Sequence, residues 1–192
     1  TKFKLVEEVA LKASYEHSVR LPLSKELLGN GSTIYANVQL RPESSENFNI
    51  GVFGNIQASE KSHIYYEVNS FMRLVDDYIQ IRVSEKEGMM QYENIPAVHI
   101  KGVEGEVDYT YSNKLHIMAN ISWQDSRDQR KYLDDGKPSA TYRNRTPNKP
   151  WIFYNAEASY TLRNVFFKDA SLKLAYNYQW VHWFYLTWAA YG

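Results

Sequence analysis

Three carboxylates spaced two residues apart are the side chains with the clearest potential for chemistry. Glu104, Glu106 and Asp108 lie in a stretch where acidic and apolar residues alternate, and Glu157 lies in a second alternating stretch. A period of two places such side chains on one face of a β-strand. Paired carboxylates can serve general acid–base catalysis, or they can line a hydrated surface. We favour the lining role for all four.

The other residues with catalytic potential are poorly placed for catalysis. His116 and Ser122 share a face of one predicted strand, but six residues of strand, roughly 20 Å, separate them, whereas a hydrolase needs its Ser–His–acid set near one rim. The chain has no cysteine, and its five histidines lack ligand spacing. They are His17, His63, His99, His116 and His182. The sequence therefore predicts no metal site and no cofactor, and it disfavours an enzyme.

Composition narrows the class of protein. The 192 residues carry no net charge, so electrostatics gives no reason to expect a nucleic-acid partner. No run of about 18 apolar residues is present, which excludes a membrane-spanning helix. A membrane β-barrel stays compatible with the low mean hydropathy of −0.54, because only every second residue of its strands meets lipid.

The elements that position these residues are predicted to be strands. Seven segments alternate with a period of two, and we expect an all-β antiparallel meander of about seven strands. Their predicted ranges are 6–19, 47–55, 63–83, 99–111, 115–124, 152–162 and 172–180. Ser24–Leu28 is predicted to form one helical turn. The connections 21–45 and 125–150 are long and 85–97 is of middle length, whereas 57–62, 113–114 and 163–170 are shorter.

This pattern of connections predicts part of a transmembrane β-barrel. Outer-membrane barrels have short periplasmic turns and long outer loops, and the strands exceed the 5 to 6 residues that are usual in globular sheets. Val103, Val107, Ile117 and Leu174 are then expected to face lipid. A soluble or surface β-domain for carbohydrate binding or adhesion and an outer-membrane hydrolase barrel are kept as alternatives.

The segment 125–150 and the aromatic residues near strand ends are candidates for recognition. Seven cations in this segment stand against four aspartates, so it is either an outer loop that attracts an anionic ligand, or a loop exposed to solvent or to lipopolysaccharide phosphates. The candidate ligand-binding residues are Tyr92, Tyr132, Tyr142, Arg143, Arg145 and Trp151. Aromatic belts at the membrane–water interface are the expected place for Trp123, Tyr178, Trp180, Trp183 and Trp188.

Five local patterns, in the same order along the chain, resemble those of TonB-dependent outer-membrane receptors. They are Val19–Pro22 with Glu26–Gly29, Leu40–Gly51, Asp77–Ile79, Tyr92–Asn94 with Ile100–Glu104, and Thr146–Pro150. The resemblance implies a 22-stranded barrel whose lumen is plugged by a separate N-terminal domain. It also implies uptake of a scarce nutrient, most often a ferric siderophore, with energy from the TonB complex.

Residues 1–192 contain no recognisable plug domain or TonB box, and about seven strands are too few to close. We therefore expect one segment of the C-terminal part of such a barrel, in the bacterial outer membrane. The implied partners are the plug domain, the remaining barrel strands, the TonB complex through the plug, outer-membrane lipid and lipopolysaccharide, and a small-molecule ligand. In this family residues such as Glu104, Glu106, Asp108 and Glu157 face the plug. Haem importers carry a histidine in the loop that matches 21–45, where this chain has none.

Overall fold

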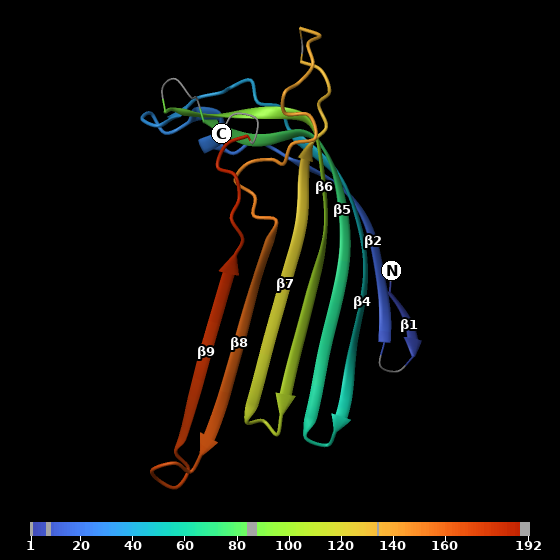
Figure 1. Ribbon diagram of the computed structural model, residues 1–192, viewed down its shortest axis with the longest axis vertical. Helices are drawn as coiled ribbons and strands as arrows, with labels where there is room; N and C mark the ends of the chain where they lie inside the picture. The colour runs from blue at the N-terminus through green and yellow to red at the C-terminus, as the bar shows by residue number, and fades with distance from the viewer. Residues whose placement is uncertain (1, 7–8, 84–87, 134, 189–192) are drawn as a thin grey trace.

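One sheet, seven of whose strands are long, makes up most of the molecule (Figure 1). The computed structural model describes residues 2–6, 9–83, 88–133 and 135–188. The elements are β1 (Lys2–Val6), β2 (Val9–Arg20), α1 (Ser24–Leu28), β3 (Ile34–Tyr35), β4 (Glu43–Ser59), β5 (Ser62–Val83), β6 (Met90–Tyr111), β7 (Leu115–Asp128), β8 (Ile152–Arg163) and β9 (Ser171–Val181). The sheet order is β1-β2-β4-β5-β6-β7-β8-β9, and β3 pairs with β6.

This order confirms the predicted antiparallel meander. Each long strand pairs with the next one in the chain in antiparallel fashion, and the predicted helical turn is present as α1. The two short strands, β1 and β3, were not predicted. In the part of the chain that the structure describes, no helix is long and apolar enough to cross a membrane.

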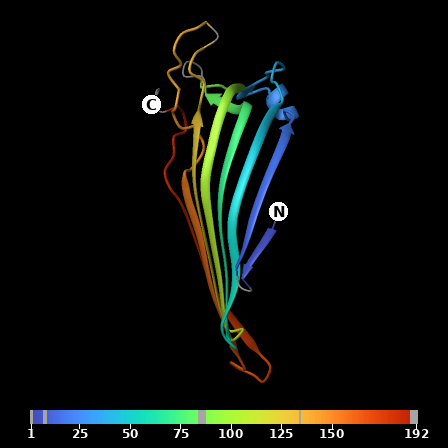
Figure 2. The ribbon, with the colours of Figure 1, turned by 90° about the vertical axis from the view of Figure 1, so that its right-hand side faces the viewer.

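The strands rise side by side with a common curvature (Figure 2). At the lower end of Figure 1 they are joined by tight turns and by the loop 164–170, and the upper end carries the long connections 21–42 and 129–151 and the tip of the β5–β6 hairpin. One tight turn places Ser112 and Asn113 at φ values of 53° and 51°, as the two central residues of a type I′ turn require. The two connections predicted to be long thus lie at the same end of the sheet, as expected, whereas the β5–β6 connection is shorter than predicted.

β6 begins earlier in the chain than predicted. The β5–β6 ladder continues to Val83↔Met90, so the predicted connection 85–97 is too long and Tyr92 lies in a strand; residues 84–87 are outside the described part. Pro96, which can donate no ladder hydrogen bond, lies within this strand. It is tolerated where the ladder bends, opposite Asp77, whose φ is 53°. Beyond this bend the hairpin runs across the top of the sheet (Figure 1).

The long strands β2 and β4 to β9 form a curved wall, and its two faces differ as the alternation predicts. Val103, Val107, Ile117 and Leu174 are 42%, 40%, 38% and 56% exposed, and cross-strand pairing places Val103 beside Trp123 and Val107 beside Ala119. We call this apolar surface the outer face. The opposite surface, the inner face, carries the carboxylates of β6. A compact soluble core around these apolar side chains is therefore not what the chain forms.

A buried apolar cluster packs on the inner face near the upper end. Its members are Phe71, Val75, Tyr78, Ile95, Val98, Ile100 and Trp188. A Cβ at Gly102 would lie 2.5 Å from the ring of Phe71, so only glycine lets this ring lie on the backbone of β6. Trp188 is 6% exposed, which makes its predicted place in an aromatic belt wrong. Trp188 lies in the segment after β9, which returns to cover β5 and β6, so strand alternation does not predict where its side chain points.

Candidate functional site

A polar hollow of about 270 Å³ lies on the inner face between β5 and β8. Its lining includes Glu67, Asn69, Glu104, Glu106, Asn120, Ser122 and Phe153. Strand register brings them together. Glu106 is paired with Glu67 on β5 and with Asn120 on β7, and Glu104 is paired with Asn69 and Ser122. The sheet therefore gathers acids and amides from neighbouring strands at one height.

The hollow is acidic because only part of its negative charge is compensated. Lys12 forms an ion pair with Glu67, and the Tyr65 hydroxyl donates to the same carboxylate at 2.5 Å. Ser122 donates to Glu104 over 3.4 Å. Within the described ranges no cation forms an ion pair with Glu104 or Glu106. A partner that fills this hollow is expected to bring positive charge or hydrogen-bond donors.

Asp108 and Glu157 share the inner face but lie outside the hollow. Asp108 Oδ2 is 2.8 Å from His116 Nε2, and Glu157 lies one strand further, since both Asp108 and Glu157 pair with Met118 of β7. Ser122 bonds to Glu104 instead. His116 and Ser122 thus belong to separate contacts, and the structure does not join them into a hydrolase triad.

Sequence reasoning missed several members of this site. Glu67, Asn69 and Asn120 line the hollow, and Lys12 reaches it from β2. The alternation within each strand placed these residues on the polar face. The sequence of one strand does not show which residues of the next strand stand opposite them. Correct cross-strand register is the signal that would have found them.

The upper end of the sheet, which carries the long connections, is called the loop end. There Trp151 lies at the centre of a cluster of aromatic rings. Its ring centroid is 4.6 Å from that of Trp183 and 5.0 Å from that of His182, and the Arg145 guanidinium lies 4.1 Å above it. Trp151 is only 9% exposed. Of the six predicted ligand residues, Arg145 and Trp151 are therefore close together and already engaged with each other.

The remaining predicted ligand residues make other contacts. Arg143 and Lys131 approach the Tyr142 ring at 5.3 Å and 5.9 Å, and Tyr132 is 65% exposed. Tyr92 lies on the β5–β6 hairpin, where its carbonyl accepts a hydrogen bond from Asn37 at 2.8 Å. The six residues share the loop end of the molecule, and the contacts among them pair Arg145 with Trp151 and Arg143 with Tyr142.

Asp125 fixes two arginines at the same end. Its carboxylate accepts from Arg127 Nε at 2.6 Å and from Arg145 Nε at 2.9 Å. It lies beyond the apolar stripe of the outer face, which ends on β7 at Trp123. Burial opposes its ionisation, but the hydrogen bonds and charges of the two arginines outweigh burial and lower the pKa of Asp125. The carboxylate is therefore ionised and holds Arg145 over Trp151.

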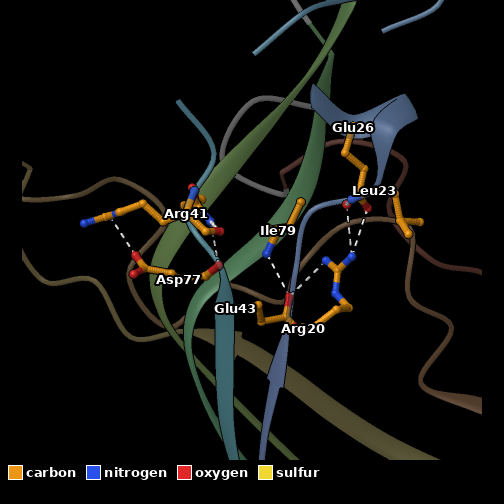
Figure 3. A network of polar contacts seen from close by, with 8 residues as sticks. Arg20, Leu23, Glu26, Arg41, Glu43, Asp77 and Ile79 are labelled. Atoms are coloured by element: carbon orange, nitrogen blue, oxygen red, sulfur yellow. Dashed lines mark hydrogen bonds and ion pairs between the residues drawn. The ribbon is translucent and has the colours of Figure 1, made fainter. Parts of the chain in front are cut away.

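A second polar network attaches the loop after β2 to the hairpin (Figure 3). Arg20 Nη1 donates to the two carboxylate oxygens of Glu26 at 3.1 Å and 3.0 Å, and its Nη2 donates to Glu43 at 3.2 Å. Glu43 in turn accepts from the Ile79 backbone N–H at 2.9 Å. Because Glu26 is buried, the loss of Arg20 would leave an uncompensated carboxylate.

The bend of the hairpin has its own polar contacts. Arg41 forms an ion pair with Asp77 at 2.7 Å, as Figure 3 shows. Asn94 Nδ2 donates to the carbonyls of Asp77 and Arg41, and its Oδ1 accepts from the Arg41 N–H. The segments that rise above the sheet are therefore connected to one another by directed polar bonds.

Comparison with known proteins gives one consistent class. The family model described as "TonB dependent receptor-like, beta-barrel" matches residues 1–192. No curated protein sequence matches. Solved structures with similar folds include the copper transporter OprC, with a TM-score of 0.61 and 17% identity over 83% of this chain and 23% of that one.

Two further structures extend the likeness. The FrpB iron transporter of Neisseria meningitidis has a TM-score of 0.57 at 17% identity, covering 94% of this chain and 25% of its own. A mutant of the ferric enterobactin receptor PfeA of Pseudomonas aeruginosa has a TM-score of 0.61 at 15% identity, covering 94% and 26%. The chain spans about a quarter of the length of these proteins. They are transporters and receptors rather than enzymes.

Proposed function

Because the chain belongs to the TonB-dependent receptor-like β-barrel family, we propose that it forms part of the wall and outer loops of an outer-membrane receptor that imports a scarce nutrient. The observation that carries the proposal is a sheet with an exposed apolar outer face and a polar inner face, matched by the family model from end to end. The receptor lies in the bacterial outer membrane and uses energy from the TonB complex.

The proposed cargo is a metal complex, and a ferric siderophore in the first instance. Three of the similar structures are named for copper, iron and ferric enterobactin, which supports a metal or its chelate as the class of cargo. At the loop end, the accessible residues Tyr132, Tyr142 and Arg143 are the proposed ligand contacts, together with Tyr92. Arg145 and Trp151 are proposed to position this surface, because their mutual stacking leaves little of Trp151 exposed.

The inner acids are proposed to face the plug domain. Glu104 and Glu106 line the hollow and form no ion pair with a described cation, since Lys12 pairs with Glu67, and a complementary basic or amide-rich surface would satisfy them. Asp108 and Glu157 extend the same face towards the turn end. The proposed role of these side chains is contact with the plug, not proton transfer.

The test uses the bacterium that carries this chain, with its gene deleted and then restored. Under iron limitation, uptake of radiolabelled ferric siderophores is expected to fall on deletion, to return with the gene, and to stop when a protonophore collapses the proton-motive force. Cell fractionation checks that the receptor is in the outer membrane. Unchanged uptake of every iron chelate tested would overturn the ligand class. A detergent-free soluble product would overturn the receptor and favour the carbohydrate-binding or adhesion alternative.

A further inference from the structure

The outer face changes character abruptly at one level of β6 and β7. Val103 and Trp123 form an exposed apolar pair, and the next outward-facing pair along the strands is Lys101 and Asp125. One step further His99 stands opposite Arg127. On β6 and β7 the apolar surface therefore ends within two residues and is followed directly by ionic side chains, whereas on β5 the apolar Met72 stands opposite Lys101.

The charges at this level are predominantly positive. Lys101 is exposed, and no acid within the described ranges forms an ion pair with it. Arg127 and Arg145 share the single carboxylate of Asp125, and their side chains are 42% and 28% exposed. Three cations around one carboxylate leave a net charge of about +2 at neutral pH, since Lys and Arg keep their protons there.

We propose that Lys101, Arg127 and Arg145 form a binding surface for the phosphate groups of an outer-leaflet lipid. The inference rests on the proposed outer-membrane location. Continuity with the lipid-facing stripe places these cations at the depth where hydrocarbon gives way to headgroups. Asp125 engages only the Nε of each arginine, and Arg127 Nη1 also donates to the Arg143 carbonyl at 2.8 Å. A phosphate offers acceptor oxygens to the remaining Nη donors, since guanidinium groups bind phosphates well, and Lys101 supplies a mobile point charge.

The neighbouring rings support an interfacial position. Trp183 is 59% exposed and packs edge-on against Trp151, over which Arg145 is stacked. Tryptophan is favoured at membrane–water interfaces because one side of the ring is apolar and the other carries an N–H donor. The cations and the exposed ring thus lie together at the same edge of the apolar stripe.

The test compares two forms of one lipid on the whole receptor. Native mass spectrometry of the detergent-purified receptor is carried out with diphosphorylated lipid A and with the same lipid after enzymatic dephosphorylation. We expect the phosphorylated form to bind more tightly, and high salt to weaken it. A basic residue near anionic lipid contributes about 1 kcal/mol, or roughly fivefold in affinity. The double variant Lys101→Gln with Arg127→Gln is therefore expected to lose roughly twentyfold.

The controls separate this surface from the rest of the receptor. Lys114→Gln, at the tight turn on the opposite end of the sheet, is expected to leave binding unchanged, and Lys101→Arg is expected to retain it. Equal binding of the two lipid forms by the wild-type receptor overturns the proposal without use of any variant. The proposal is also overturned if the double variant folds and binds phosphorylated lipid A as tightly as the wild-type receptor does. Siderophore uptake is measured separately, so a failure here leaves the proposed transport intact.

Discussion

The wall of the sheet and its loop end are stabilised in different ways. In the wall, Val107 stands next to Ala119 on the outer face while Glu106 faces the hollow, and strand pairing fixes both. At the loop end, Trp188 is buried against Tyr78 and Ile95, which are distant in sequence. A local alternation determines the wall, whereas the loop end depends on segments that return from elsewhere in the chain.

The largest effect is expected at the loop end. Trp188→Ala should reduce the free energy of local opening there by about 3–5 kcal/mol, the usual loss when a large buried aromatic side chain is removed. Hydrogen exchange of the amides around Tyr78 and Ile95 measures this loss. Trp183→Ala is the matched control, because Trp183 is 59% exposed and removal of its ring contact should cost only about 0.5–1.5 kcal/mol. Equal losses in the two variants would show that the inner-face cluster does not hold the loop end.

The second prediction concerns the wall, where a charge should be tolerated on one face only. Val107→Lys is expected to destabilise the receptor in phospholipid bilayers by about 2–4 kcal/mol, because a basic side chain near the bilayer midplane loses its hydration. Glu106→Lys, the adjacent residue on the inner face, is expected to change stability by about 0.5 kcal/mol, as is usual for hydrated positions. Urea unfolding in bilayers measures both. If Glu106→Lys were the more damaging change, the assignment of the two faces would be reversed.

The same contrast explains how far the sequence predicts the fold. Alternation over 103–109 predicted which side chains share a face, because side-chain direction in a strand is a local property. It also located the long strands and the tight turns. The start of β6 was placed too late: the ladder continues beyond Pro96, a residue type that is usually confined to strand edges and bulges.

The candidate site was less predictable than the fold. The acids of β6 were recognised, but Glu67, which reaches the same hollow from β5, was not, since the pairing of strands decides which residues meet. Trp188 was expected at a membrane interface by its type, and only the return of the C-terminal segment onto β5 and β6 shows its buried place. The contact between Arg145 and Trp151 likewise depends on Asp125, which a scan of single residues does not connect to them.

The smallest predicted effect is a pH dependence confined to the loop end. Arg127 and Arg145 hold the pKa of Asp125 below its ordinary value of 3.8 against the opposing effect of burial. A carboxylate with a lowered pKa in the folded state contributes stability that is complete above its unfolded pKa and is lost as the pH falls through the folded value. Partly exposed ion pairs of this kind are worth about 0–1 kcal/mol, so the segment 145–151 should loosen slightly below about pH 4 while the wall is unaffected.

Hydrogen exchange of the amides in 145–151, corrected for the intrinsic effect of pH, measures this loosening between pH 5 and pH 3. Asp125→Asn removes the titrating group and should abolish the pH dependence. Asp135→Asn is the matched control, because the pKa of Asp135 is also lowered, by Lys137, but that pair is exposed and away from Arg145. If Asp125→Asn left the acid-induced loosening intact, another group would have to hold Arg145 over Trp151, and the loop end would depend less on ionic contacts than its geometry indicates.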